Sequence, residues 1–427
     1  MKINIIILAV ASCFCTVAFS QNSLQNYIEL AEQNSPLLQK QENKKRIIEL
    51  DLKQFNAVYK SPKINLNSNV LFSPIISTDG NTNRLEWASS GSLNYIGYDL
   101  GATNGGQYQA LISVNQPLFT QKYMSVHQNN AKLLQEKNAY SAKLTKAELE
   151  QVVTHQYLLC VQSQKQKKNI RKTIQVLKEQ IQQMQALVKA GIYKLTDLKL
   201  LEIELKNNQI EEERLKGSYI DNFNVLNLLC GITDTTIFDL DEINLDLNSP
   251  VQKASLFSKQ YKLDSLTVKS EQKIFNLQYL PQISAFGDAG LNATYQPGFD
   301  RLGFSVGLSI TCKLFDGHQR KINDEKAIFQ LSNIETDRKY FENQNNIRKK
   351  NILSQIDNLN KQLALIDTQL SEYENLFELY KIEIKTGLIS VLELKNLIRE
   401  ISAKQQIKTN TLISKEILIN SYNYWNL

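Results

Sequence analysis

The 427-residue sequence predicts an α+β fold that is mostly α, internally duplicated and dominated by long antiparallel coiled-coil helices. Three observations lead to this prediction. A glycine-containing stretch occurs twice, a long helical pattern enters and leaves each copy, and two strand-like segments precede each long helix. Both halves of the chain therefore carry the same elements in the same order, namely helix, two strands, long helix, turn and returning helix.

The repeated stretch covers Lys189–Lys199 and Lys385–Lys395, which are offset by 196 residues (385 − 189). In both copies the glycine is followed at +4 by an aliphatic residue, at +6 by a carboxylate, at +7 by leucine and at +8 by lysine. Glycine readily takes the positive φ that ends a helix. Gly191 and Gly387 therefore predict tight turns between antiparallel helices.

The segments ahead of both turns carry apolar residues at alternating steps of four and three. This spacing is a heptad seam, and it predicts helices that pack along their length in a left-handed supercoil. The offset of 196 residues also relates the two seams, which are Ile170, Ile174, Leu177, Ile181, Met184 and Val188 in the first copy and Ile366, Leu370, Tyr373, Phe377, Tyr380 and Ile384 in the second.

The first repeat, residues 21–248, contains three helical stretches. Pro36 breaks the first of them, residues 23–60, and Pro62 ends it, because proline cannot continue a helix. Residues 120–190 contain neither proline nor internal glycine, and a helix of that length is on the order of 100 Å long. A returning helix and a connector follow at residues 195–230 and 232–249. The second repeat, residues 249–427, has helical patterns at about residues 251–279, 319–385 and 391–425.

Two strands precede the long helix of each repeat. In the clearest strand, large apolar residues at even positions from Leu302 to Ile310 alternate with glycine, serine and threonine. Such alternation gives a sheet one apolar face and one small or polar face. Residues 73–107 are rich in small and polar residues and are expected to form a long loop. The four strands are expected at about residues 63–73, 108–118, 282–294 and 302–315.

Four strands are too few to close a barrel around a pore. An open four-stranded sheet in lipid would leave unpaired edges, which a membrane does not tolerate. We therefore expect several chains to pool their strands into one barrel, with the apolar face toward lipid. The helices would then continue the wall as a coiled-coil cylinder in aqueous space.

The chain resembles the TolC family of outer-membrane efflux ducts over nearly its whole length after the first 20 residues. The order, spacing and duplication of the elements carry the resemblance, together with both glycine turns and two motifs. These motifs are Leu280-Pro281-Gln282-Ile283, and Phe304-Ser305-Val306-Gly307-Leu308-Ser309-Ile310 leading to Leu314-Phe315-Asp316-Gly317.

The resemblance implies a homotrimer in which an α-barrel is joined to a transmembrane β-barrel made of four strands per protomer. Such a duct lies in the cell outer membrane, contacts its lipid and extends into the periplasm. It implies two further partners, a periplasmic adaptor (membrane fusion) protein and an inner-membrane pump of the RND or ABC type. The implied function is the outer channel of a tripartite efflux or secretion system.

In this family the glycine turns form periplasmic tips that contact the adaptor, and acidic residues just beyond them line a constricted mouth. Carried over by motif, Asp197 and Glu393 are the candidate gate carboxylates. The candidate adaptor contacts are Gly191, Ile192, Leu195, Thr196, Gly387, Leu388 and Val391.

The sequence departs from the family pattern at two positions near the second turn. Ile389 stands where an arginine would tie the gate shut, and Asn396 replaces a second acid. Closure is therefore expected to rest on packing. Asp197 and Glu393 also have a structural alternative, because a carboxylate in the first turn of a helix interacts favourably with the helix dipole.

Residues 1–20 are predicted to be a secretory signal peptide, with a lysine near the start, an apolar stretch and a small-x-small site at Ala18–Ser20. The alternative is a lipoprotein signal, because Val10–Cys13 fits a lipobox and cleavage there would lipidate Cys13. Secretion without lipidation is favoured, since that cleavage would leave the apolar Phe14–Phe19 beside the lipid, where a polar tether is expected.

Composition argues against nucleic-acid binding and catalysis. The net charge is +6 and the lysines are scattered, so no concentrated basic patch for nucleic acid is expected. We find no catalytic triad, phosphate loop, cofactor motif or metal-ligand spacing, and predict that the chain is not an enzyme. The three remaining cysteines are expected to be buried structural thiols. The three cysteines are Cys160, Cys230 and Cys312, and the three histidines, which are far apart along the chain, are His127, His155 and His318.

A different class of function remains open, a secreted periplasmic coiled-coil scaffold without channel activity. Such a scaffold would bury the apolar face of Leu302–Ile310 in its own core. A duct would expose that face to lipid.

Overall fold

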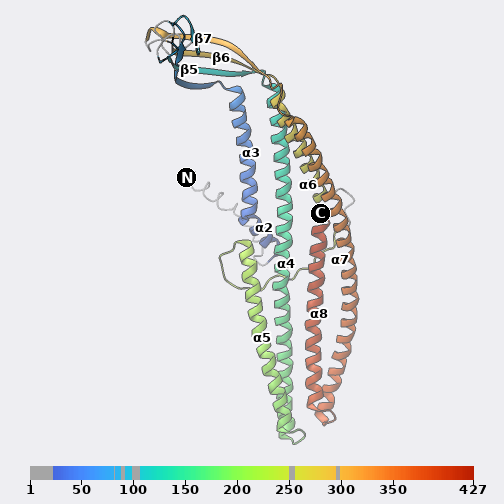
Figure 1. Cartoon of the computed structure of the whole chain (residues 1–427). Coiled ribbons are helices and arrows are strands. Elements are labelled where there is room, and N and C mark those ends of the chain that lie inside the picture. The colour runs from blue at the N-terminus through green and yellow to red at the C-terminus, as the bar shows by residue number, and fades with distance from the viewer. Residues whose placement is uncertain (1–22, 81, 88–91, 99–105, 250–254, 295–298) are drawn as a thin grey trace, which may run out of the picture. The chain divides into compact units, whose positions relative to one another are not determined.

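The computed structural model describes residues 23–80, 82–87, 92–98, 106–249, 255–294 and 299–427 (Figure 1). The predicted signal peptide, residues 1–20, and the candidate lipidation site Cys13 lie outside these residues. The chain divides into two compact units, which we call the helical unit and the sheet unit. The helical unit comprises Met1–Glu42, Tyr140–Gln260 and Asp337–Leu427, and the sheet unit comprises Asn43–Ala139 and Tyr261–Thr336.

The α-helices begin and end where the sequence places its stop signals. Pro36 is the first residue of its helix, a position where the missing N–H of proline costs nothing. Figure 1 shows α5 returning from the end of α4 and α8 returning from the end of α7. The helices are α2 (Leu24–Asn34), α3 (Pro36–Lys60), α4 (Gln121–Lys189), α5 (Leu195–Cys230), α6 (Leu256–Asn276), α7 (Gln319–Thr386) and α8 (Val391–Trp425).

Four antiparallel strands form the main sheet of the sheet unit, in the order β1-β5-β6-β7. The central pair, β5 and β6, joins the first half of the chain to the second. The register aligns Leu66 with Ile112, Ile112 with Ala289, and Ala289 with Phe304. The strands are β1 (Lys63–Phe72), β5 (Gly106–Leu118), β6 (Gln282–Ala293) and β7 (Leu302–Thr311).

The sheet unit departs from the sequence-based expectation in two places. The segment 73–107, expected to be a loop, contains a small sheet of order β3-β2-β4, in which Ile75 is buried. β7 was expected to reach residue 315 but ends at Thr311, which pairs with Gln282, the first residue of β6. Pro281 precedes that residue and has no N–H to extend the ladder. The small strands are β2 (Ile75–Ser77), β3 (Arg84–Glu86) and β4 (Tyr95–Ile96).

The cysteine prediction was wrong at one position. Cys160 and Cys230 are buried in the helical unit, and burial raises the pKa of both thiols, to about 12 in each case. Cys312 is exposed, because it directly follows the last paired residue of β7.

Two clusters of buried apolar side chains hold the helical unit together. The first joins α2, α4, α5 and α8 with the connector, and it contains the fully buried Tyr157 and Phe223. The second joins α4, α5, α7 and α8 beside the two glycine turns. It contains the heptad residues Leu177, Met184 and Ile384, so the predicted seams are core positions where the helices meet.

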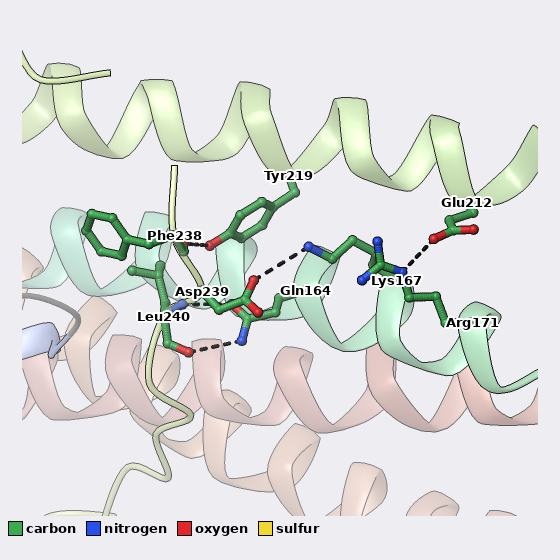
Figure 2. Close-up of polar contacts among 8 residues, drawn as sticks. All are labelled: Gln164, Lys167, Arg171, Glu212, Tyr219, Phe238, Asp239 and Leu240. Carbon is green, nitrogen blue, oxygen red and sulfur yellow. Dashed lines mark hydrogen bonds and ion pairs between the residues drawn. The ribbon is translucent and has the colours of Figure 1, made fainter. Parts of the chain in front are cut away.

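The connector between the halves, residues 232–249, has neither helical nor strand structure and is held by side chains of the helices. The amide of Gln164 on α4 pairs with both the N–H and the carbonyl of Leu240, at 2.9 and 3.0 Å. The hydroxyl groups of Tyr157 and Tyr219 donate to connector carbonyls, and Glu416 accepts from the N–H of Leu245. Figure 2 shows the hydrogen bonds from Gln164 to Leu240 and from Tyr219 to Phe238.

Among the described residues, no helix is both long enough and apolar enough to cross a membrane.

Candidate functional site

Both glycine turns end their helices in the same way. Gly191 and Gly387 each have φ of 75°, in the left-handed region that favours glycine. The N–H of the residue after each glycine donates to a carbonyl five positions earlier, from Ile192 to Leu187 at 3.0 Å and from Leu388 to Glu383 at 3.2 Å. This is the Schellman arrangement, which satisfies helix carbonyls that would otherwise lack partners. The sequence prediction of tight turns is confirmed.

The two candidate gate carboxylates both cap the helix that follows the turn. Asp197 accepts a hydrogen bond from the N–H of Lys194 at 3.0 Å. Glu393 accepts from the N–H of Ser390 at 2.8 Å and from its hydroxyl at 2.9 Å, and the Ser390 hydroxyl accepts from the N–H of Glu393 at 3.2 Å. The Ser390 N–H and hydroxyl hold the pKa of Glu393 below its usual value, because they stabilise the charged form. Each carboxylate therefore has a structural role at a helix start.

One hydrogen bond ties the two turns together. The hydroxyl of Tyr193 donates to the carbonyl of Ile389 at 2.7 Å. These residues are equivalent positions of the repeat, separated by the same offset of 196 (389 − 193). Burial, and to a smaller extent the charge of Asp197, raises the pKa of the Tyr193 hydroxyl, so it remains a donor. In the sequence, the only indication of this contact is that Tyr193 and Ile389 occupy equivalent positions of the repeat.

The turns present apolar side chains to solvent. The exposed fractions are 46% for Ile192, 61% for Leu195 and 76% for Leu388. Thr196 and both turn glycines are also exposed. We call this surface the tip patch. Leu392, which is 50% exposed, is a further member that was not predicted from the sequence.

The assignment of Val391 as a contact residue was wrong. Its side chain is 1% exposed and packs in the cluster with Leu394 and Ile398. Its equivalent in the first turn, Leu195, is the exposed member of the pair. The sequence shows an aliphatic residue at +4 in both copies and cannot distinguish a core position from a surface one.

The main sheet carries an apolar face that the described residues of the sheet unit leave largely exposed. The register places even positions of β1, β5 and β7 beside odd positions of β6. Large members of this face are strongly exposed, with 75% for Leu66 and 84% for Phe304. We call it the strand face, and its exposed members are Ile64, Leu66, Val70, Phe72, Ile112, Val114, Leu302, Phe304, Val306, Leu308 and Ile310.

The opposite face of the same sheet is mostly polar. Asn67 on β1 donates to the hydroxyl of Ser113 on β5 at 3.0 Å, and Gln109 on β5 donates to Asn292 on β6 at 3.2 Å. The Ser305 hydroxyl on β7 donates to Asp288 on β6 at 3.3 Å. The sheet thus has one face suited to an apolar environment and one suited to water.

Within the described residues, no group of three or more histidine, cysteine or acidic side chains could hold a metal ion.

Comparison with known proteins identifies this arrangement. Residues 68–231 match the family model of outer membrane efflux proteins. This match covers 164 of the 427 residues (231 − 67). Proteins of this kind are transport channels rather than enzymes, which agrees with the predictions of TolC-family resemblance and of no enzymatic activity.

Solved structures share the fold over almost the whole chain. The CusC channel has a TM-score of 0.72 at 12% identity, covering 95% of this chain and 92% of that chain. The outer membrane protein VceC from Vibrio cholerae has 0.67 at 13% identity, covering 93% and 95%. The Campylobacter jejuni CmeC outer membrane channel has 0.67 at 13% identity, covering 94% and 85%. These likenesses confirm the mostly helical fold with a sheet. None of the curated protein sequences compared with the chain matches it.

Proposed function

We propose that the chain is one protomer of a homotrimeric duct in the cell outer membrane, extending into the periplasm. The duct passes substrates of a tripartite efflux or secretion system to the exterior. The observation that carries the proposal is the strand face, an apolar surface across all four strands of the main sheet with a polar surface behind it. Exposed apolar area of this extent is unfavourable in water and favourable in lipid.

The edges of the main sheet support a shared barrel. Among the described residues, β1 pairs only with β5 and β7 only with β6, so each has one open edge. In lipid an open edge leaves N–H and carbonyl groups without partners. If β7 of one copy pairs with β1 of the next, three copies of the four-stranded sheet supply twelve strands and close a transmembrane β-barrel.

Exposed apolar residues on the long helices support contacts between copies in an α-barrel. Ile203 and Ile210 on α5 are exposed and seven residues apart, so they lie on one helix face. Tyr340 and Ile347 on α7 have the same spacing and are also exposed. Faces of this kind pack against a neighbouring helix in a coiled coil, and a second copy of the chain provides that helix.

The tip patch is the proposed contact surface for a periplasmic adaptor protein, which would connect the duct to an inner-membrane pump of the RND or ABC type. Ile192, Leu195 and Leu388 supply apolar area for such a contact, and Gly191, Thr196 and Gly387 supply exposed turn backbone. Apolar side chains at an exposed tip are typical of a protein interface.

Asp197 and Glu393 are the proposed gate carboxylates. In a trimer each occurs three times around the axis, and such rings attract cations and repel one another. Cation binding or protonation would then favour narrowing. Their capping bonds are compatible with this role, because one carboxylate oxygen of each residue remains available.

The test of the duct is negative-stain electron microscopy of protein extracted from membranes in mild detergent. We expect a threefold particle with a detergent-wrapped end and a rod on the order of 100 Å long. A monomeric particle that stays in solution without detergent would instead establish the scaffold function. The exposure of the strand face already disfavours that alternative, which requires the face to be buried in the chain's own core.

The test of the gate is conductance in planar bilayers. Asp197→Ala combined with Glu393→Ala should raise the conductance and weaken block by divalent cations. Glu49→Ala combined with Asp51→Ala, exposed carboxylates on α3, removes the same charge elsewhere and should change neither. Unchanged conductance and cation block in the first variant would refute the gate assignment and leave the duct itself intact.

A further inference from the structure

A concentrated basic stretch, which was not predicted from the sequence, lies on α4. Five cationic residues fall within eight positions, and no carboxylate occurs between Glu150 and Glu179. The mild net charge of the whole chain concealed this local excess. The cations are Lys165, Lys167, Lys168, Arg171 and Lys172.

These five side chains line a hollow of about 500 Å³ in the helical unit. Gln164 and Gln175 on α4 also line it, and the connector contributes Asp239 and Glu242. Five cations and two anions leave the lining with a charge of +3 (5 − 2). The volume lies in the range typical of sites for small molecules, about 300–1,000 Å³.

The nearby carboxylates neutralise only part of the basic stretch. Lys165 pairs with Glu242 at 3.0 Å, and Lys167 pairs with Asp239 at 3.5 Å. Arg171 pairs with Glu212 of α5 at 2.5 Å, as Figure 2 shows.

Lys168 and Lys172 have no acidic partner among the described residues. They are four positions apart and both exposed, so they share one helix face. Like charges at this spacing repel each other unless an anion lies between them.

The carboxylates in the hollow can be displaced without moving the connector. The side chains of Asp239 and Glu242 are 71% and 53% exposed, so each carboxylate can move into solvent when an anion takes its place. The connector backbone is fixed independently by uncharged groups, the Gln164 amide on Leu240 and the Tyr219 hydroxyl on the carbonyl of Phe238 (Figure 2). The hollow therefore keeps its shape while Lys165 and Lys167 change partners.

We propose that this hollow binds a small molecule carrying two or more phosphate groups. Lys168 and Lys172 hold one phosphate between them, and Lys165 and Lys167 receive a second in place of their connector carboxylates. Phosphate oxygens suit lysine and arginine because the hydrogen bonds are charge-assisted on both sides. The cations span about two helical turns, roughly 10 Å, so two phosphate groups reach both pairs of lysines better than a single anion does. The proposal does not depend on the duct function.

The first arm of the test is calorimetric titration of the full-length protein in detergent with inorganic pyrophosphate. We expect saturable binding of one pyrophosphate per chain that weakens as salt rises. Lys168→Ala combined with Lys172→Ala should weaken it about tenfold or more, since two charge-assisted contacts are lost. Lys44→Ala combined with Lys45→Ala, two exposed lysines on α3, removes the same charge and should leave the affinity unchanged.

A second double variant should strengthen pyrophosphate binding instead of weakening it. Asp239→Asn combined with Glu242→Gln removes the carboxylates that compete for Lys167 and Lys165, so pyrophosphate should bind several-fold more tightly. A purely structural role of these ion pairs would not produce that gain. Thermal unfolding of each variant checks that the helical unit remains folded.

The second arm distinguishes a free phosphorylated molecule from a phosphorylated lipid headgroup. Full-length protein is mixed with phosphatidylcholine vesicles with and without cardiolipin, whose headgroup carries two phosphate groups. Binding to pyrophosphate identifies a free ligand. Binding only to the cardiolipin vesicles, lost in the Lys168/Lys172 variant, identifies a headgroup. The proposal is overturned if the protein binds neither pyrophosphate nor the phosphorylated lipid. It is also overturned if the Lys44/Lys45 control loses as much affinity as the Lys168/Lys172 variant.

Discussion

The two glycine turns follow the same sequence pattern and the same backbone geometry, yet their side chains face different surroundings. Both glycines have φ of 75°, and both are followed by a helix that a carboxylate caps. At +4, however, Leu195 is 61% exposed and Val391 is 1% exposed. At +2, Tyr193 donates a hydrogen bond and Ile389 accepts it through its backbone.

This difference separates features that depend on neighbouring residues from features that depend on how the helices pack. A Schellman turn and a capping carboxylate depend on a few neighbouring residues, so duplication preserves them. Exposure depends on which helices pack around a position. Val391 lies in the cluster formed by all four helices of the two hairpins, and Leu195 lies outside it. The turns are therefore equivalent in backbone and unequal in exposure, with the first supplying more of the tip patch.

The largest expected effect is at the +4 position. Val391→Ala removes two buried methyl groups and leaves a cavity, which should cost about 2 kcal/mol of unfolding free energy. Leu195→Ala, the matched variant in the first turn, should change it by less than about 0.5 kcal/mol because the side chain is exposed. Thermal unfolding in detergent, followed by far-ultraviolet circular dichroism, measures both. Equal destabilisation would mean that the two turns have the same environment.

A smaller difference is expected at the glycines. Either glycine changed to alanine should cost about 1–2 kcal/mol, because φ of 75° is unfavourable for a residue with a Cβ. A Cβ at Gly387 would also lie 3.3 Å from Cγ2 of Ile192, whereas a Cβ at Gly191 would meet no atom within 4 Å. Gly387→Ala should therefore be the more destabilising variant in the same unfolding measurement. The reverse order would contradict the close contact between the turns.

The hydrogen bond between the turns should contribute about 1 kcal/mol. Tyr193→Phe removes the donor to the Ile389 carbonyl and keeps the aromatic ring. If the two hairpins of one chain must move apart to open a channel, this variant should also raise the mean conductance in planar bilayers. Tyr373→Phe on α7 is the matched control, because this side chain is also half-buried and its hydroxyl makes no hydrogen bond among the described residues. Equal behaviour of the two variants would exclude a specific contribution of Tyr193.

The parts of the fold that could be predicted from sequence are those with a repeated or periodic signal. The heptad seams predicted the buried Leu177, Met184 and Ile384, and the alternation from Leu302 to Ile310 predicted a strand with an apolar face. The small sheet around Ile75 was missed because its strands are two or three residues long, too short for alternation to be recognised. The connector was recognised as a segment, but its bonds to Gln164 and Glu416 are tertiary.

The candidate site was predictable to a similar extent. The positions of the turns and capping carboxylates followed from residue type and spacing, because both are local. The burial of Val391 and the bond from Tyr193 to Ile389 required the packing of one hairpin against the other. The basic hollow was missed because the connector that completes it is about 70 residues away from Lys168 along the chain.

The smallest expected effect distinguishes the two caps by pH. Glu393 accepts hydrogen bonds from both the N–H and the hydroxyl of Ser390, whereas the corresponding Lys194 has no hydroxyl to donate to Asp197. The pKa of Glu393 is lower in the folded chain than its ordinary value of 4.5. A depressed carboxyl pKa means that the cap stabilises the fold fully above the unfolded pKa and is lost as pH falls through the folded pKa.

Glu393→Gln should therefore unfold at a lower temperature than the unmodified chain near neutral pH, and the gap should narrow below about pH 4.5. Ser390→Ala removes the hydroxyl and keeps the N–H donor. The difference in unfolding temperature between this variant and the unmodified chain should therefore be smaller, and it should narrow over the same pH range. The measurement is the unfolding midpoint of each variant across a pH series. A gap for Glu393→Gln that stays constant through acid pH would show that the charge of Glu393 does not support the cap, and the second turn would then be held by packing alone.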